Sequence, residues 1–286
     1  MPPVTKVVVP YLAGAADWLT ASGGQAGQML PAGRRAAAQD FLAEIERAGL
    51  THVILVSGWD RPAGPCFRDR GAELVSLLAG PGGSGGVLFG AGPGHINFSC
   101  LRQRKLRGLA DALLATRHLV ADEDFVVLSA GTVIEDNGGE GFLARLIRCH
   151  RATAAAATFA VGDVARGDTP ACGVVTPGAT NGLFSRVSDI EEASPGGTPG
   201  GLAVAGRYVF SREIFDVIEH MPARPDGEVH LSDCFRELID EEAPVYCVKL
   251  PPGATPRPSS DLGNFLSALL DFAFPSSGPG SGLGDS

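Results

Sequence analysis

Short apolar runs alternate with segments of helical periodicity through the first part of the chain. Residues 7–9 (VVV) form one run, and THVILVSG (residues 51–58) forms the next. Between them, residues 34–48 carry apolar side chains at the spacing of one helix face, and Gly49 ends this predicted helix. A strand, a helix and a second strand in this order are typical of a βαβ unit, so we expect a parallel sheet.

The same two patterns continue to residue 274. We expect helices at residues 72–78, 142–153, 212–221, 227–242 and 261–274, and a further helix that follows a basic loop within residues 102–120. We expect strands within residues 87–98 (a pair), 124–131, 157–161, 173–175, 183–192, 202–211 and 243–250. The last residues, 275–286, have the composition of a disordered tail, which leaves one domain over residues 1–274.

The composition favours a compact folded protein without a nucleic-acid or membrane partner. Hydrophobic residues make up 44% and charged residues 19% of the 286 positions. The net charge is −9, and the longest basic run is RQRKLR (residues 102–107). Nucleic acids and anionic membranes bind positively charged surfaces, so we expect neither as a partner of this chain.

The cysteines are isolated from one another in the sequence. Without a CxxC pair among them, we expect free thiols rather than a zinc site or a disulfide framework. The six positions are Cys66, Cys100, Cys149, Cys172, Cys234 and Cys247. The N-terminal residues lack the apolar segment of a signal peptide, and no apolar run reaches bilayer length, so we expect a cytoplasmic protein.

The loop after the first apolar run is rich in small residues but lacks positive charge. Gly and Ala are frequent in residues 12–28, and neither Lys nor Arg occurs between Lys6 and Arg34. A small-residue loop after a buried strand is typical of a phosphate-binding turn at the carboxyl edge of a parallel sheet. Phosphate chemistry there would use cations, so the pattern indicates a nucleotide-type loop without its usual charge.

Six segments resemble, in order, the motifs of one enzyme family. They are QMLP (residues 28–31), RQRKLRGLADALL (102–114), VSDIEEAS (187–194), AVAGRYVFSREIFDVIE (203–219), GEVHLSD (227–233) and LGNFLSALLDFA (262–273). Together they resemble the bacterial UTP–glucose-1-phosphate uridylyltransferases of the sugar-1-phosphate nucleotidyltransferase family. The resemblance implies an α/β, Rossmann-like nucleotidyltransferase fold, in which helices flank a mostly parallel mixed sheet with a small β-rich lid. It also implies attack of a sugar 1-phosphate on a nucleotide, release of pyrophosphate, and Mg²⁺ as the cofactor.

The positions that this family uses to bind phosphate and metal carry other residue types here. By the resemblance they are Asp17 in place of Arg, Gly23 and Gly27 in place of Lys, Gly131 in place of the metal-binding Asp, and Ala193 in place of a sugar-phosphate Lys. A carboxylate at Asp17 would repel phosphate where Arg would attract it. Without a carboxylate at position 131, Mg²⁺ loses a hard oxygen ligand.

Other parts of the implied pocket are kept. The resemblance implies nucleotide binding at Leu12, Ala13, Gly14, Gln103 and Gly108, sugar binding at Gly173 and Glu192, and a weak metal position at Asp233. Ordinary structural roles stay open for these residues: Gln103 as a loop amide, Asp233 as an acid near a helix start, and the glycines as turns. We interpret His230, close to Asp233 in sequence, as a structural residue.

The pattern leaves two hypotheses for the function. In the first, the chain is a non-catalytic relative that binds a uridine nucleotide or a UDP-sugar, as a homo-oligomer or beside an active paralogue. In the second, it is an active nucleotidyltransferase that forms a UDP-sugar from UTP and a sugar 1-phosphate, or an enzyme of related chemistry. The second hypothesis needs cations from Arg34, Arg35 or Lys105, and Mg²⁺ on Glu135 or Asp136.

Overall fold

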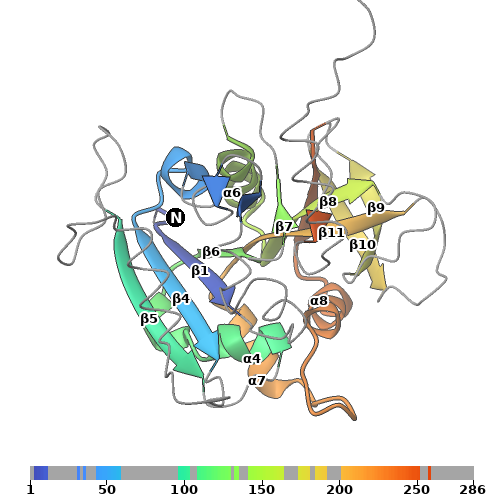
Figure 1. The fold of residues 1–286 in the computed structure, drawn as a ribbon. Helices are drawn as coiled ribbons and strands as arrows, with labels where there is room; N and C mark the ends of the chain where they lie inside the picture. Colours follow the sequence, from blue (N-terminus) through green and yellow to red (C-terminus); the bar gives the residue numbers. More distant parts are fainter. Residues whose placement is uncertain are drawn as a thin grey trace, which may run out of the picture.

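Among the residues that the computed structural model describes, nine strands form one central sheet (Figure 1). The described residues are 3–11, 31–32, 35–36, 43–58, 96–103, 108–129, 132–134, 141–163, 173–180, 184–191, 201–251 and 257–258. The strand order is β5 (Asn97–Gln103), β4 (His52–Gly58), β1 (Lys6–Tyr11), β6 (Phe125–Leu128), β11 (Leu202–Phe210), β8 (Ala157–Asp163), β12 (Val245–Lys249), β10 (Ser185–Glu191) and β9 (Val174–Thr180). Two small sheets accompany it: β2 (Pro31–Ala32) with β3 (Arg35–Ala36), and β7 (Thr132–Val133) with β13 (Arg257–Pro258).

The first half of the sheet is parallel, as the sequence predicts. β1 pairs in parallel with β4 on one side and with β6 on the other, and β4 pairs in parallel with β5. A strand that is covered on both faces needs apolar side chains at successive positions, and Val7, Val8 and Val9 are all buried. Because the four strands run in one direction, their carboxyl ends meet along one edge of the sheet.

The second half of the sheet begins at β11 and is mainly antiparallel. β11 pairs antiparallel with β6, β8 and β9, and β10 pairs antiparallel with β9 and β12. β8 and β12 form a further parallel pair. The architecture is therefore a mixed, Rossmann-like sheet flanked by helices, which confirms the fold class predicted from the sequence.

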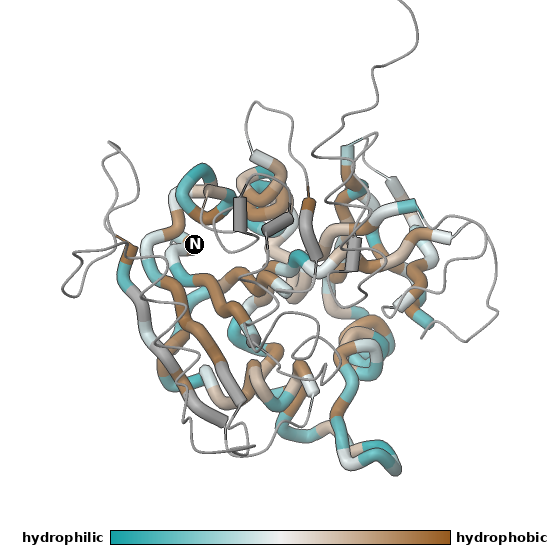
Figure 2. The backbone as a smooth tube through the Cα atoms, in the orientation of Figure 1, coloured by the Kyte–Doolittle hydropathy of each residue, from teal (hydrophilic) through white to brown (hydrophobic). Residues whose placement is uncertain are grey.

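Helices cover both faces of this sheet. One face packs against α4 (Gly108–Leu114), α5 (Arg117–Val120), α7 (Ile214–His220) and α8 (Leu231–Asp240), and the other packs against α6 (Phe142–Thr153) and the helical residues 43–47. Figure 1 shows α6 above the sheet and α4, α7 and α8 below it. Alternating strand residues face the two layers: Val8 of β1 belongs to the core cluster that contains the buried residues of α4 and α8, whereas Val7 and Val9 belong to the cluster that contains those of α6. In Figure 2 the tube along β1 and β4 is correspondingly brown.

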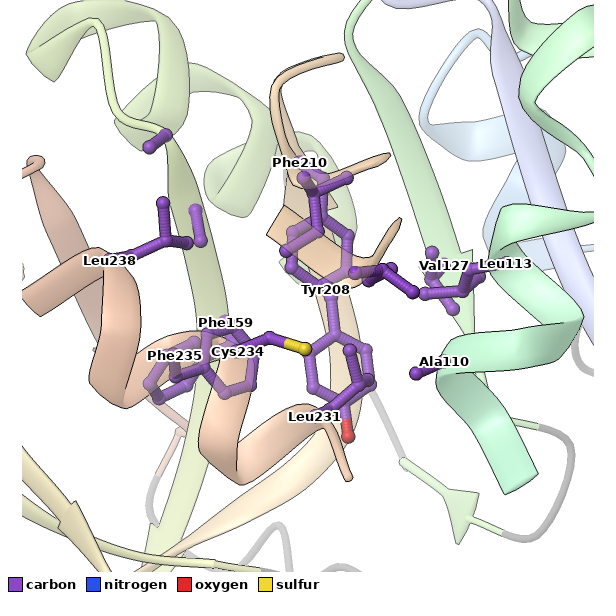
Figure 3. Close-up of a cluster of buried hydrophobic side chains, with 14 of the residues drawn as sticks. Ala110, Leu113, Val127, Phe159, Tyr208, Phe210, Leu231, Cys234, Phe235 and Leu238 are labelled. Atoms are coloured by element: carbon purple, nitrogen blue, oxygen red, sulfur yellow. The ribbon is translucent and has the colours of Figure 1, made fainter. Parts of the chain in front are cut away.

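Aromatic side chains hold β11 and β8 against α8. The Phe210 ring stacks on the Phe235 ring with 5.8 Å between their centroids, and the Phe159 ring lies 4.8 Å from Phe235. Tyr208 stacks on Phe210 at 5.7 Å. Figure 3 shows Tyr208 and Phe210 between the side chains of α8 and Leu113 of α4. Each such pair adds about 0.5–1.5 kcal/mol beyond the area that it buries, so this cluster fixes α8 on the sheet.

The predicted helix at residues 102–120 is divided, and its expected basic loop starts inside a strand. Arg102 and Gln103 are the last residues of β5, which begins at Asn97 and overlaps the strand pair predicted within residues 87–98 only at residues 97 and 98. Residues 87–95 lie outside the described part. Thr116 separates α4 from α5. Its hydroxyl and its backbone N–H both donate to the carbonyl of Leu113, at 2.7 and 2.8 Å. A side chain that pairs locally with the backbone in this way competes with helix continuation.

The predicted helix at residues 227–242 is shorter than expected, because α8 begins at Leu231 and ends at Asp240. A turn precedes it. The backbone N–H of Arg224 donates to the carbonyl of Glu228, and the N–H of Gly227 donates to the carbonyl of Arg224, each at 2.8 Å. Gly227 has a φ of +81°, which a residue with a side chain adopts only with strain.

The predicted helix at residues 34–48 is wrong at its start, because the backbone of β3 (Arg35–Ala36) pairs with Pro31–Ala32 and only residues 43–47 are described as helical. β9 continues to Thr180 instead of ending at 175. The other described elements lie where the sequence predicts them. The small sheets β2–β3 and β7–β13 were not predicted, since two-residue strands are too short to show periodicity. The predicted helices at 72–78 and 261–274 and the predicted tail at 275–286 lie outside the described residues, so the single-domain organisation over 1–274 stays a prediction. Among the described helices, none has the length and apolar character needed to cross a membrane.

Candidate functional site

The carboxyl edge of the parallel strands is where sheets of this type bind their ligands. β1 ends at Tyr11, β4 at Gly58, β5 at Gln103 and β6 at Leu128. Gly58 and Gln103 lie opposite each other in the strand register. The backbone of Gln103, a predicted nucleotide-binding residue, therefore lies on this edge, but its side chain is outside the described part.

A buried ion pair lies at this edge of the sheet, where β11 pairs with the end of β6. Arg207 on β11 is 1% exposed, and its Nε and Nη2 atoms donate to Glu44 in the helical residues 43–47. The distances are 3.0 Å from Nε to Oε1 and 2.9 Å from Nη2 to Oε2, so both carboxylate oxygens are used. Two parallel charge-assisted bonds of this kind fix the relative orientation of the two groups. The pair thereby ties β11 to the helical residues 43–47.

The same guanidinium also reaches the backbone at the end of β6. Arg207 Nη1 donates to the carbonyls of Ser129 and Gly206, each at 3.4 Å, and the Ser129 N–H donates to the Gly206 carbonyl at 2.8 Å. Gly206 has a φ of +70° at an irregularity in the pairing of β11 with β8. Ser129 is two residues before Gly131, the position predicted for a lost metal ligand. No local pattern in the sequence singles out Arg207, although it lies inside the motif AVAGRYVFSREIFDVIE.

Gly108 has a backbone conformation that favours glycine, and it lies against the side chain of Glu228. Its φ is +81°, and a Cβ atom built on it would lie 2.6 Å from Oε2 of Glu228. The residue thus opens α4 with a backbone that lies directly against the turn before α8. Close backbone approach at this position agrees with the predicted role of Gly108 beside a bound base, but the contact that the structure places there is Glu228. Nucleotide binding at Gly108 stays a prediction.

Asp233, the predicted weak metal position, lies in the first turn of α8 and is paired with Arg224. Arg224 Nε donates to Oδ2 at 2.6 Å and Nη2 donates to Oδ1 at 2.7 Å. Arg236 approaches Oδ1 at 3.4 Å. These guanidinium contacts, with the Arg224 hydrogen bonds as the largest cause, lower the pKa of the Asp233 carboxyl below its ordinary value. Asp233 is therefore ionised at neutral pH and already neutralised by arginine.

The described residues around Asp233 do not fit a Mg²⁺ site. Mg²⁺ requires oxygen ligands in near-octahedral geometry. Both oxygens of Asp233 accept hydrogen bonds from Arg224, so the carboxylate would have to give up these bonds before it could bind the metal. Within the described ranges, no group of three or more His, Cys, Asp or Glu side chains could hold a metal ion. We therefore derive no catalytic step through a metal from these residues.

His230 occupies the N-cap position of α8 without a capping bond from its side chain. Its Nε2 instead lies 2.9 Å from Oδ2 of Asp226. The backbone N–H of Glu228, and then the hydrogen bond to His230, lower the pKa of the Asp226 carboxyl. These contacts are consistent with the structural interpretation of His230, since they join the turn at residues 224–228 to the start of α8.

Gly173, a predicted sugar-binding residue, precedes β9 and packs against β10. An added Cβ would lie 3.0 Å from Cδ1 of Ile190 and 3.3 Å from the carbonyl of Glu191. The Gly173 carbonyl accepts a hydrogen bond from the N–H of Val204 at 3.1 Å. Close packing of three strands thus accounts for a glycine here without any ligand, and the sugar contact stays a prediction.

The remaining predicted site residues lie outside the residues that the structure describes. They are Leu12, Ala13, Gly14, Asp17, Gly23, Gly27, Gly131, Glu192 and Ala193, together with Arg34, Lys105, Glu135 and Asp136. Arg35 is described only through its backbone pairing with Ala32 in β2–β3. Their assignments stay predictions from the sequence.

A cavity of about 160 Å³ lies on the face of the sheet that carries α6. Its walls are Arg145, Arg148, Cys149, Ala152, Phe184 and Val248. Ligand pockets usually measure about 300–1,000 Å³, so the space is too small for a nucleotide sugar. Burial raises the pKa of the Cys149 thiol to about 12, so it is not a nucleophile. Cys234 and Cys247, the other described free cysteines, are also buried, and burial raises their thiol pKa values to about 12 and about 11.

Comparisons with known proteins agree with this architecture. The model of a family described as nucleotidyl transferase matches residues 66–268. A UTP–glucose-1-phosphate uridylyltransferase of Streptococcus pyogenes is 28% identical over 241 residues, which span 83% of this chain and 79% of the relative. A second relative, UTP–glucose-1-phosphate uridylyltransferase 2 of S. pyogenes serotype M3, is 28% identical over 242 residues, with 83% and 81% coverage.

Solved structures show the same fold. A UDP-glucose pyrophosphorylase complexed with UDP-glucose has a TM-score of 0.75 and 17% identity, over 94% of this chain and 98% of the other. The UTP-bound enzyme of Acinetobacter baumannii has a TM-score of 0.73 and 22% identity, over 94% and 93% of the two chains. At these identities the likeness concerns the fold alone, and it confirms the predicted nucleotidyltransferase fold. The family model and the S. pyogenes relatives confirm the resemblance in sequence.

Proposed function

This chain belongs to the nucleotidyl transferase family, and from that premise we propose that it binds a uridine nucleotide or a UDP-sugar without transferring the nucleotidyl group. Phosphoryl transfer depends on positioning and on neutralising phosphate charge, with little covalent help from the protein. A member that lacks the neutralising groups keeps a nucleotide-shaped site but loses the chemistry. The proposed role is therefore regulatory, through the bound ligand or through a protein partner.

One observation carries this proposal. The resemblance aligns a carboxylate, Asp17, with the family's phosphate-binding Arg, and glycines at 23, 27 and 131 with two Lys and the metal-binding Asp. A carboxylate facing phosphate at near-contact distance is repelled by about 4 kcal/mol at an effective dielectric constant near 20, where a guanidinium would be attracted. Removing one electrostatic group that stabilises a transition state typically costs a factor of about 10²–10³ in rate, and here several are replaced.

Two charged residues that the structure describes also support the loss of nucleotidyl transfer. Asp233, the acidic residue that could have taken over metal binding, is held by Arg224. Arg207, a buried cation near the edge, is committed to Glu44 and to backbone carbonyls. Neither side chain is available to replace the charges that positions 17 and 131 lack.

An active enzyme that forms a UDP-sugar is the second candidate. The similarity to named uridylyltransferases over 83% of the chain favours it, since the frame of the fold is kept. This alternative requires Mg²⁺ on carboxylates beyond the described residues and cations from Arg34, Arg35 or Lys105. For the first candidate we propose that the chain acts as a homo-oligomer or in a complex with an active paralogue. We also propose a cytoplasmic location.

Pyrophosphate release from UTP and glucose 1-phosphate tests the loss of chemistry. We expect no Mg²⁺-dependent release above background from the native chain. The double variant Asp17→Arg, Gly131→Asp restores two family residue types, and we expect measurable release from it, because both charges return together. Glu237→Gln, which alters an exposed residue of α8 outside these motifs, is the control. Clear release by the native chain that disappears on replacing Glu135 or Asp136 would establish the second candidate instead.

A further inference from the structure

The Arg207–Glu44 pair joins three parts of the chain that lie far apart in the sequence. Glu44 belongs to the helical residues 43–47, Arg207 to β11, and Ser129 directly follows β6. Arg207 and Glu44 are separated by 163 positions, and Arg207 and Ser129 by 78. We propose that this pair is a positioning device: it holds the Ser129 backbone at the carboxyl end of β6 in the geometry that ligand binding at this edge requires. The inference rests on the proposed function for the identity of the ligand.

The surroundings of the pair make a purely stabilising role a poor explanation. Its neighbours on this face of the sheet are apolar, among them Leu128, Ala205 and Val209. Among the described residues, Glu44 and Arg207 are the only Asp, Glu, Lys or Arg side chains classed as buried. Taking two charges out of water costs free energy that their attraction only partly offsets, and apolar replacements of similar volume often give equal or greater stability. The best-attested use of such a pair is to specify one geometry among several.

The hydrogen bonds show which geometry is specified. Two nitrogens of Arg207 bind Glu44, and the third binds the carbonyls of Ser129 and Gly206. A lysine or an apolar residue could fill the space, but neither has the planar fork that serves a carboxylate and two carbonyls together. Gly206 contributes as well, since its carbonyl accepts the Ser129 N–H at 2.8 Å.

Ser129 lies at the edge of the sheet where a ligand is expected, so its position matters for binding. Ser129 stands where β6 leaves the sheet, at the edge where α/β folds bind ligands in the loops after their strands. β7 begins three residues later, at Thr132. A displacement of Ser129 would move the start of this connection. In positioned catalytic sites a misplacement of about 1 Å lowers the rate by about 100-fold, and we expect ligand contacts at this edge to be sensitive to displacement as well.

A double variant separates positioning from stability. Glu44→Leu with Arg207→Met removes both charges at similar volume. We expect its thermal midpoint to return close to that of the native chain, whereas the single variant Glu44→Leu unfolds much earlier because it leaves Arg207 buried without its carboxylate. We expect the double variant to bind UDP-glucose about tenfold or more weakly than the native chain despite its recovered stability, as measured by calorimetry. Arg117→Gln, which breaks an exposed pair with Asp216, is the control and should leave the affinity unchanged.

Amide hydrogen exchange provides the readout that does not depend on any ligand. In the double variant we expect exchange at residues 129–134 to accelerate about tenfold or more, while exchange in β12 stays as in the native chain. Unchanged exchange at 129–134 would overturn the inference whether or not UDP-glucose binds. If the native chain binds no nucleotide or nucleotide sugar, the proposed function fails, and the exchange result still decides the role of the pair. Full affinity in the double variant would also overturn it, because the pair would then be dispensable for binding.

Discussion

Two arginine–carboxylate pairs lie near the candidate site, and they differ in burial. Arg207 and Glu44 have side chains that are 1% and 11% exposed, whereas those of Arg224 and Asp233 are 29% and 17% exposed. Both arginines use two nitrogens on two carboxylate oxygens. The Arg207–Glu44 pair therefore joins two secondary-structure elements in the core. The Arg224–Asp233 pair, called the rim pair below, joins the turn at residues 224–228 to the helix that follows it. Because the contact geometry is alike, we expect the environment of each pair to decide how much it contributes to stability.

The buried pair should show the largest effect when one partner is removed. Glu44→Gln leaves the Arg207 charge in an apolar layer, so we expect the free energy of unfolding to fall by about 3–5 kcal/mol. Urea denaturation measures this change. Glu46→Gln alters an exposed residue of the same helical stretch and should change little. A loss below about 1 kcal/mol for Glu44→Gln would mean that Arg207 finds enough other partners, and the contrast between the two pairs would collapse.

The rim pair should show a smaller effect that depends on pH. Asp233→Asn keeps the shape but removes the charge, and we expect a loss of about 1–2 kcal/mol at pH 7. The Asp233 pKa is lowered from an ordinary value of 3.8, so its stabilisation is complete above that pH and is lost as the pH falls through the folded-state pKa. The difference between the native chain and Asp233→Asn should therefore shrink below about pH 4. Glu237→Gln, on the exposed side of α8, is the control and should show no such convergence.

The variant Gly108→Ala tests the contact between the start of α4 and Glu228. Gly108→Ala brings a methyl group to 2.6 Å from the Glu228 carboxylate at a φ of +81°, so we expect a loss of about 1–2 kcal/mol. Gly49 has a similar φ, +72°, with no atom within 4 Å of an added Cβ. Gly49→Ala therefore measures the backbone strain alone, and the excess cost of Gly108→Ala measures the contact with Glu228. Equal costs for the two variants would show that the Glu228 side chain moves aside without measurable cost.

The exposed pair of Arg117 with Asp216 should show the smallest effect. Arg117 donates to Asp216 at 2.5 Å and to Glu219 at 2.7 Å, and these contacts, with the Asp216 hydrogen bond as the largest cause, raise the pKa of the guanidinium, but all three groups face water. Such pairs gain little, because water and salt screen them and two flexible side chains must be ordered. We expect the thermal midpoint of Arg117→Gln to match that of the native chain. A clear drop in the midpoint would show that short distance alone predicts the contribution of a pair in this protein.

The sequence predicted those parts of the fold that carry a local signal. β1, β4 and β6 are apolar runs, and α6 has a regular apolar face, so each could be placed to within a few residues. The division of the helix at Thr116 depends on one side-chain hydrogen bond, and the late start of α8 depends on the turn at Gly227. Such competition between local bonds and helix continuation is not visible in periodicity.

The candidate site was predicted less completely, for a physical reason. The resemblance located Gln103, Gly108 and Asp233 along the chain, and Asp233 does lie in the first turn of a helix as its structural alternative expected. It did not reveal that Arg224 holds Asp233, nor that Arg207 and Glu44 meet across 163 positions. The partner of a charged side chain is a property of the folded topology, which no pattern within one segment contains.

A calorimetric titration of the native chain with UDP-glucose, in the presence and in the absence of Mg²⁺, tests the central claim most directly. The account predicts measurable binding whose affinity is the same with and without Mg²⁺, because the residues proposed to bind the base and the sugar are kept while the phosphate and metal positions are not. Absence of binding in both titrations would contradict the account. Binding that strictly requires Mg²⁺ would contradict it as well, since it would show that the chain still assembles a metal site for phosphate.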